Sequence, residues 1–171
     1  MDRSGKERTD EALADMARKA HAAYATLAAA MVEDRLAQLI QTKMPNLSNR
    51  LKKKLFTGYG PFGSLSVKID TAFAMGLITL EVSRNLHAIR EVRNAFAHST
   101  KILHFHDDEI AELLKKFPSF KPSRDNLGFY ISRLKLCVDA IDPQLKNAAL
   151  AGALLGYGRG VSSSQKTSRE K

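Results

Sequence analysis

The sequence predicts an all-α protein, a single-domain bundle of about six or seven helices. Apolar residues recur at three- and four-residue steps through most of the chain, which is the spacing of one helix face. No segment shows the strong two-residue alternation of a half-buried strand. With 171 residues, 44% hydrophobic and 26% charged, the chain is long enough for one domain with its own core.

The first helix is predicted to begin after Asp10, which can cap it. Residues 1–9 and 157–171 are polar and poor in large apolar side chains, so both ends are expected to be disordered around a helical domain at 10–156. Pro45 ends the first helical run. Its predicted core stripe is Leu13, Met16, Ala20, Tyr24, Leu27 and Met31, continued by Val32, Leu36, Leu39 and Ile40.

A short basic helix is predicted next, around Leu47, Leu51 and Leu55, followed by the loop "TGYGPFG" at 57–63. Ser64 is a plausible N-cap for a helix that runs to about Leu80. The expected core stripe of that helix is Leu65, Ile69, Phe73 and Leu77. A further helix at about 83–98 has Leu86, Ile89, Phe96 and Ala97 on one side.

The C-terminal third is predicted to begin with an irregular segment at 98–106. Asp107 can cap a helix that Pro118 ends, and Ser123 opens the last long helix. Asp142 and Pro143 read as a cap and a first helical residue, so one more helix is expected to about Leu155. The stripe of the long helix is Leu127, Ile131, Leu134, Val138 and Ile141.

Composition narrows the function classes. The single Cys137 excludes an internal disulfide framework and a cysteine zinc site. The polar N-terminus does not resemble a signal peptide, and no apolar run is long enough to span a bilayer, so a soluble, cytoplasmic protein is expected. The net charge of +9 favours anionic partners, and nucleic acid is one of them. The alternative is that the basic residues form solvated faces and a basic tail.

The loop "GYGPFG" matches the dinucleotide fingerprint G-x-G-x-x-G letter for letter. That fingerprint requires a preceding strand, whereas a basic amphipathic helix precedes this one. Gly60, Pro61 and Gly63 are therefore interpreted as a tight interhelical loop, and no cofactor is expected. One alternative is that Gly63 and Ser64 lead into a helix N-terminus that holds a phosphate.

Two charged residues interrupt the apolar helix after Ser64. Lys68 and Asp70 are two positions apart, so they point to different sides of the helix and cannot form an ion pair along it. Each is expected to meet a partner on another helix. A functional polar cluster with Ser64 is the alternative.

The stretch "REVRNAFAHS" at 90–99 is the strongest candidate site. Arg93 lies on the apolar stripe, one turn from Ile89, so it requires a carboxylate, a carbonyl, a partner chain or a phosphate. Asn94 and His98 share another face, about 140° from Arg93 for His98 on an ideal helix. They are either structural residues at a helix end or, with Arg93, a set for RNA cleavage. His104 and His106 give only a weak metal signal, and no metal is expected.

Two blocks, "LFTGYGPFGSLSVKIDTAFAMGLI" and "LHAIREVRNAFAHST", together resemble the mannitol operon repressor family over about residues 51–105. The resemblance implies a helical protein that negatively regulates transcription of a sugar or mannitol-type operon. It also implies a regulator without an obvious helix-turn-helix, acting through a protein partner. Within the blocks it marks Gly60, Pro61, Gly63, Ser64, Lys68 and Asp70.

A shorter resemblance concerns Arg93, Asn94 and His98, which fit the R-polar-x-x-x-H signature of HEPN domains. Those are helical proteins that often dimerise and often cut RNA without a metal. The resemblance implies that His98 transfers the proton, Arg93 binds the phosphate and Asn94 assists. The bundle would then be HEPN-like.

A non-enzymatic transcriptional regulator is the favoured hypothesis. The alternative is a metal-independent, toxin-like endoribonuclease that uses Arg93 and His98. The expected partners are a second copy of the chain, RNA or DNA, or a transcription-regulator protein, and no membrane.

Overall fold

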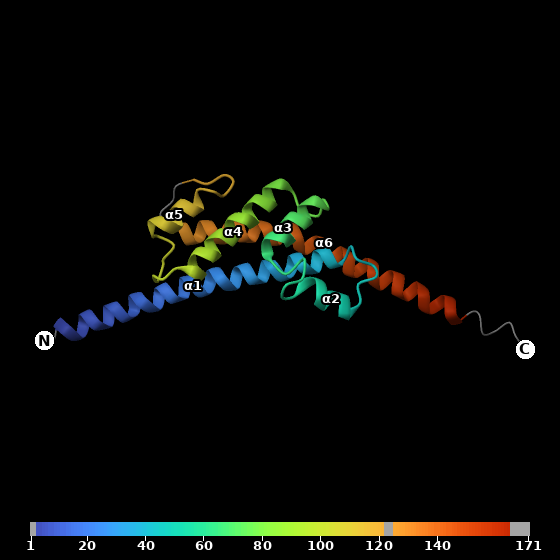
Figure 1. The fold of residues 1–171 in the computed structure, drawn as a ribbon, viewed down its shortest axis with the longest axis horizontal. Helices are drawn as coiled ribbons and strands as arrows, with labels where there is room; N and C mark the ends of the chain where they lie inside the picture. Colours follow the sequence, from blue (N-terminus) through green and yellow to red (C-terminus); the bar gives the residue numbers. More distant parts are fainter. Residues whose placement is uncertain (1–2, 122–124, 165–171) are drawn as a thin grey trace, which may run out of the picture.

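The computed structural model describes residues 3–121 and 125–164, without the side chains of residues 3–7, 14, 17–18 and 152–164. These residues contain six α-helices and no strand, which confirms the all-α fold class (Figure 1). The helices are α1 (Arg3–Gln41), α2 (Asn49–Phe56), α3 (Leu65–Ala74), α4 (Leu80–His98), α5 (Asp108–Leu114) and α6 (Asn126–Ser164).

Helix α4 is the centre of the bundle, because it packs against α1, α3, α5 and α6. The long helices α1 and α6 also pack against each other, and each extends beyond the bundle toward its own end of the chain (Figure 1). The largest fully buried side chains come from all of these helices except α2. They include Leu36, Ile40, Ile69, Leu86, Ile89, Ile110, Tyr130 and Ile141, with Phe105 from the loop before α5.

Three helices begin at a hydroxyl cap. Ser48, Ser64 and Thr79 each accept a hydrogen bond from the backbone N–H three residues later, at 3.3 Å in each case. Such caps satisfy amide groups that would otherwise lack a partner at a helix start. This confirms the predicted cap at Ser64. Thr79 is the cap of α4, so that helix begins at Leu80 rather than at the expected residue 83. Helix α3 ends at Ala74, well before the predicted Leu80, because Gly76 adopts a φ of +68°.

The predicted core stripe of α1 is wrong in its N-terminal part. All six residues from Leu13 to Met31 in that stripe are exposed, Leu27 by 73% and Met16 by 68%. The buried face is instead Ala25, Ala28, Ala29, Val32, Leu36, Ala37, Leu39 and Ile40. Small alanines let α1 lie close to its neighbours. The sequence prediction had instead followed the stripe that holds most of the large apolar residues in this part of the helix. Phe73, Ala97 and Ile131 are also exposed, against prediction.

The predicted break at Asp142 and Pro143 is also wrong, because α6 continues through both. Proline removes one helical hydrogen bond, and contacts on either side of it hold the helix together. Asp142 Oδ1 accepts a hydrogen bond from Arg35 Nε at 2.8 Å, and Gln144 Nε2 donates to the carbonyl of Leu77 at 2.8 Å. These tertiary contacts outweigh the local signal.

The predicted disorder at the two chain ends stays a prediction, although described helices reach into both ranges. Residues 3–9 continue α1 and residues 157–164 continue α6. The predicted opening of the last helix at Ser123 lies outside the described residues, which resume at residue 125.

Candidate functional site

A cluster of three charges joins α1, α3 and α4. Glu33 on α1 receives both cations: its Oε1 lies 2.6 Å from Lys68 Nζ, and its Oε2 lies 3.9 Å from Arg93 Nη2. Lys68 Nζ also lies 3.5 Å from the carbonyl oxygen of Gly63, just before α3. Both Lys68 and Arg93 therefore meet a carboxylate on another helix, as their positions on apolar faces required.

The burial of the cluster is uneven. Lys68 is only 4% exposed, whereas the side chains of Arg93 and Glu33 are 29% and 26% exposed. A buried ammonium group is costly without a counter-charge, and Glu33 supplies that counter-charge for Lys68. The second cation leaves the cluster with one excess positive charge.

A second, more exposed pair joins α3 to α4. Asp70 Oδ1 lies 3.0 Å from His87 Nε2. This confirms that Lys68 and Asp70, two positions apart, reach different helices. The sequence interpretation had given His87 no role.

The three residues of the HEPN-like signature do not converge on one point. Arg93 faces Glu33, while Asn94 is half-buried and His98 is exposed in the last turn of α4. Within the described part of the chain, the side chains of Asn94 and His98 make no hydrogen bond or ion pair. In one copy of the chain, Arg93 therefore makes a contact between helices, whereas His98 lies exposed at the end of α4.

The glycine-rich loop folds back onto the end of α2. The amide of Phe62 donates to the carbonyl of Leu55 at 2.8 Å, and Gly63 N donates to Gly60 O at 2.8 Å. A Cβ atom on Gly60 would lie 2.4 Å from the carbonyl oxygen of Lys54, and one on Gly63 would lie 2.3 Å from that of Gly58. Both glycines are therefore required for close backbone approach. The ring of Phe62 packs on Phe56 with centroids 5.0 Å apart.

Helix α2 presents a basic surface. We use the name "α2 surface" for the exposed residues Arg50, Leu51, Lys52, Lys53, Lys54 and Tyr59. None of its four cations has an ion pair among the residues that the structure describes. The sequence between Arg35 and Ile69 contains no acidic residue, so the positive charge has no local compensation.

The histidines near α5 form a ring cluster. His21 stacks edge-on against His104 and Phe105, at 5.5 and 5.6 Å between centroids. Burial, followed by the charges of His104 and His106, lowers the pKa of His21. Asp107 Oδ2 accepts a hydrogen bond from the amide of His104 at 2.7 Å, which orders the loop. The described residues contain no group of three potential metal ligands.

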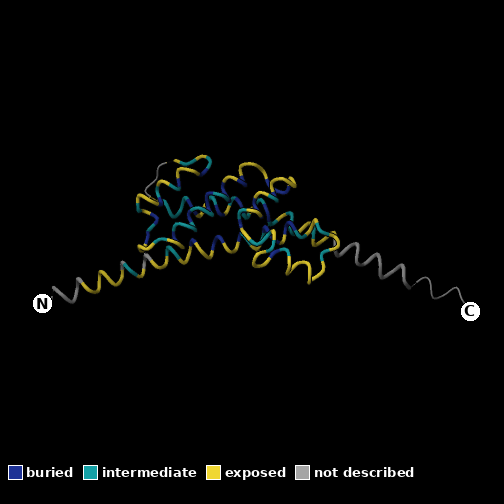
Figure 2. Tube along the Cα trace, viewed as in Figure 1, coloured by how far each residue is buried: buried dark blue, intermediate teal, exposed yellow. Residues whose placement is uncertain are grey.

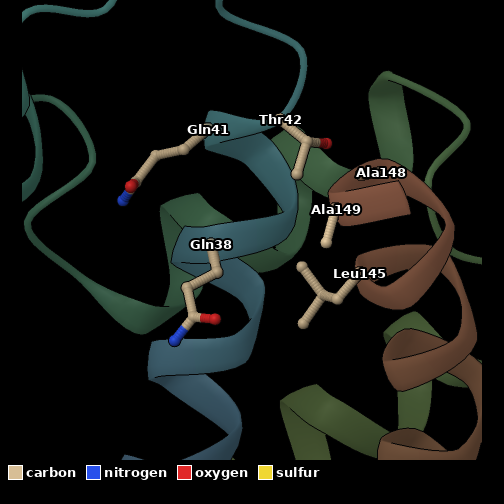
Figure 3. Close-up of a pocket in the computed structure, with 6 residues that line it drawn as sticks. All are labelled: Gln38, Gln41, Thr42, Leu145, Ala148 and Ala149. Carbon is tan, nitrogen blue, oxygen red and sulfur yellow. The ribbon is translucent and has the colours of Figure 1, made fainter. Parts of the chain in front are cut away.

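A shallow groove of about 380 Å³ lies where the end of α1 meets α6 (Figure 3). Gln38 and Thr42 face Leu145 and the alanines of α6 across it. None of the cluster residues lines this groove. No helix among the described residues has the length and apolar character needed to cross a bilayer.

The sequence interpretation missed Glu33 and His87. Glu33 lies one turn from Ala29 and one turn from Ala37, both buried, so it is a charge beside the core face. That is the same signal that identified Arg93. It could be recognised only after the alanine-rich face of α1 was known to be the core face.

The sequence model of the family described as mannitol repressor (MtlR) matches residues 7–127, from α1 to the start of α6. No curated protein matches the chain. A solved chain described as the X-ray structure of the MtlR-HPr complex from Escherichia coli is 17% identical, with a TM-score of 0.48, over 74% of this chain and 84% of that one. Because the family model covers well over half of its residues, the chain belongs to the mannitol repressor family.

Proposed function

We propose that this protein is a non-catalytic negative regulator of transcription that docks an acidic protein partner on its α2 surface. One observation carries the proposal: four exposed cations without a described counter-charge lie in the same short stretch, 50–59, as the exposed Leu51 and Tyr59. Leu51 is 43% exposed and Tyr59 is fully exposed. Unpaired charges accelerate and orient encounter with an oppositely charged partner, and an exposed aromatic residue supplies the contact area.

Direct reading of an operator is not favoured by the arrangement of the helices. A helix-turn-helix motif places its second helix in the major groove of DNA, so that helix must be free on one side. The candidate pair is α3 and α4, separated only by residues 75–79. Helix α4 is covered by α1, α3, α5 and α6, so it cannot serve as a recognition helix without disrupting the bundle.

RNA cleavage is not favoured by the contacts of Arg93. A phosphate-binding arginine must be free to reach the scissile phosphate, yet Arg93 faces Glu33. The proton-transfer candidate His98 lies on another side of α4. The ribonuclease alternative therefore has no contact that supports it.

The proposal is tested by repression of a mannitol-operon reporter in cells that lack their own copy of the protein. The variant Lys53→Glu/Lys54→Glu should lose most repression, because it reverses charge at the α2 surface. The matched control Lys101→Glu/Lys121→Glu makes the same change at exposed lysines elsewhere. Equal repression by both variants, at equal protein levels, would contradict a role for α2.

Direct binding assays separate the kinds of partner. HPr, named with the Escherichia coli protein, is a suitable first probe, and its affinity should fall at least 10-fold with Lys53→Glu/Lys54→Glu. A gel shift on upstream DNA at two salt concentrations tests the nucleic-acid alternative; a sequence-specific shift that persists at high salt would oppose the proposal. RNA cleavage in EDTA that disappears in His98→Ala would show that the protein is an enzyme.

The α2 surface is unsuitable for the expected homodimer. In a two-fold dimer the same patch meets itself, so four cations would face four cations. Self-association needs a different, uncharged surface.

A further inference from the structure

An apolar stripe on α1 has no partner within the chain. We use the name "α1 stripe" for its six exposed residues: Leu13, Met16, Ala20, Tyr24, Leu27 and Met31. At 3.6 residues per turn they fall within one narrow band of the helix, nearly opposite the face that packs on α3, α4 and α6. The positions of Asp15 and Lys19 lie off this band, so no charged residue interrupts it. Interface centres show the same depletion of charge.

The N-terminal half of the stripe lies where α1 leaves the bundle. The tube in Figure 2 is exposed along most of this part of α1, and Figure 1 shows no other helix beside its end. A helix without tertiary packing is only marginally stable in water, because its stability comes mainly from burying an apolar face. This segment therefore gains stability if the stripe is covered.

The order of residues identifies a second copy of the chain as the cover. In an antiparallel pair of α1 helices centred near residue 22, Leu13 of one copy lies opposite Met31 of the other. Ala20 lies opposite Tyr24, and Met16 lies nearest to Leu27. The stripe thus pairs with its own reverse, large residue with large residue, and the smallest side chain faces the tyrosine. Self-complementarity of this kind is what a two-fold interface requires.

The area is also sufficient. The six side chains leave on the order of 500 Å² in contact with water, comparable to the roughly 300–600 Å² of the largest functional patches on monomers. Pairing two stripes would bury roughly 1,000 Å² in total, about the minimum for a specific interface. Mixed charges flank the stripe, including the ion pair between Lys19 and Asp15. That does not resemble the basic polar face of a helix that binds anionic lipid.

We infer that this protein forms an antiparallel two-fold dimer through the α1 stripe. The protruding N-terminal half of each α1 lies along residues 24–31 of the second copy, on the side away from that copy's core. The inference rests on residues of α1 alone, so it does not depend on the function proposed for the α2 surface.

The oligomeric state of the full chain tests the inference. Analytical ultracentrifugation over a concentration series should show a dimer for the wild type at tens of micromolar. Leu27→Glu and, separately, Met16→Glu should each weaken dimerisation at least 100-fold, while a retained cooperative unfolding transition shows that the bundle itself still folds. Leu150→Glu is the matched control, because Leu150 is 63% exposed on α6 and lies off the stripe. It should remain dimeric.

A wild type that stays monomeric up to about 1 mM would overturn the inference, as would a dimer that survives both the Leu27→Glu and the Met16→Glu substitution.

Disulfide formation tests the direction of the pair. Mixing Ala20→Cys with Tyr24→Cys should give mainly the mixed disulfide, because position 20 faces position 24 of the second copy. Predominant 20–20 and 24–24 products would overturn the antiparallel register. The native Cys137 does not interfere, because it is fully buried and burial raises the pKa of its thiol to about 12.

Discussion

Lys68 on α3 and Glu33 on α1 form an ion pair at 2.6 Å, with the lysine almost fully buried. The pair connects the two blocks of the repressor motif to the first helix, because Arg93 on α4 approaches the other oxygen of the same carboxylate. One acidic side chain thus sets the relative position of three helices.

Replacing Glu33 should therefore destabilise the protein more than replacing Lys68. Glu33→Gln leaves a buried ammonium beside a neutral amide, and we expect a loss of roughly 2–3 kcal/mol in the free energy of unfolding. Lys68→Met removes the buried charge and keeps the side-chain volume, so it should cost about 1 kcal/mol or less. Urea unfolding measures both. A larger loss for Lys68→Met would contradict the role given to Glu33.

Arg93 and His98 should separate in their effect on stability. Arg93→Ala removes a contact between α4 and α1 and should cost about 1 kcal/mol. His98→Ala changes an exposed side chain with no described partner and should stay within about 0.5 kcal/mol of wild type. Thermal unfolding at one pH compares the two variants. Equal destabilisation would mean that His98 makes a contact that one copy of the chain lacks.

The glycine-rich loop should tolerate alanine at one position and not at another. Gly60→Ala places a Cβ atom 2.4 Å from a backbone carbonyl oxygen that cannot move freely, so we expect a loss of about 2 kcal/mol or more. Gly58→Ala meets no atom within 4 Å and pays only for a φ of +58°, about 1 kcal/mol. Chemical denaturation of the two variants gives the comparison. The same cost at both positions would show that backbone strain, rather than close approach, explains the loop.

His21 should make the protein less stable in mild acid. Its folded pKa lies below the ordinary value of 6.5, mainly because of burial. The unfolded chain therefore binds the proton more readily, and stability falls as the pH drops through 6.5 toward the folded pKa. His21→Phe keeps a ring against Phe105 and cannot be protonated. Its melting temperature should fall less than that of the wild type between pH 7.5 and 5.5. Identical pH profiles would contradict the prediction.

Local chemistry explains what could be predicted about the candidate site. Arg93, Lys68 and Asp70 stand out because a charge on an apolar helix face needs a partner, and all three have one. Their partners could not be named, because Glu33 is 35 residues from Lys68 in the chain and 60 from Arg93. Which carboxylate reaches which cation depends on how the helices cross.

Neighbouring residues alone were enough to predict most of the helices, the cap at Ser64, the tight glycine loop and the family motif, because each of these is a local feature. Which face of α1 is the core face depended instead on how the helices pack together. Both faces are apolar, and close packing on α3, α4 and α6 selects the alanine-rich face over the face with Leu27 and Met31. Tertiary contacts likewise carried α6 through Pro143, where the binding of Asp142 to Arg35 and of Gln144 to Leu77 outweighs the lost backbone hydrogen bond.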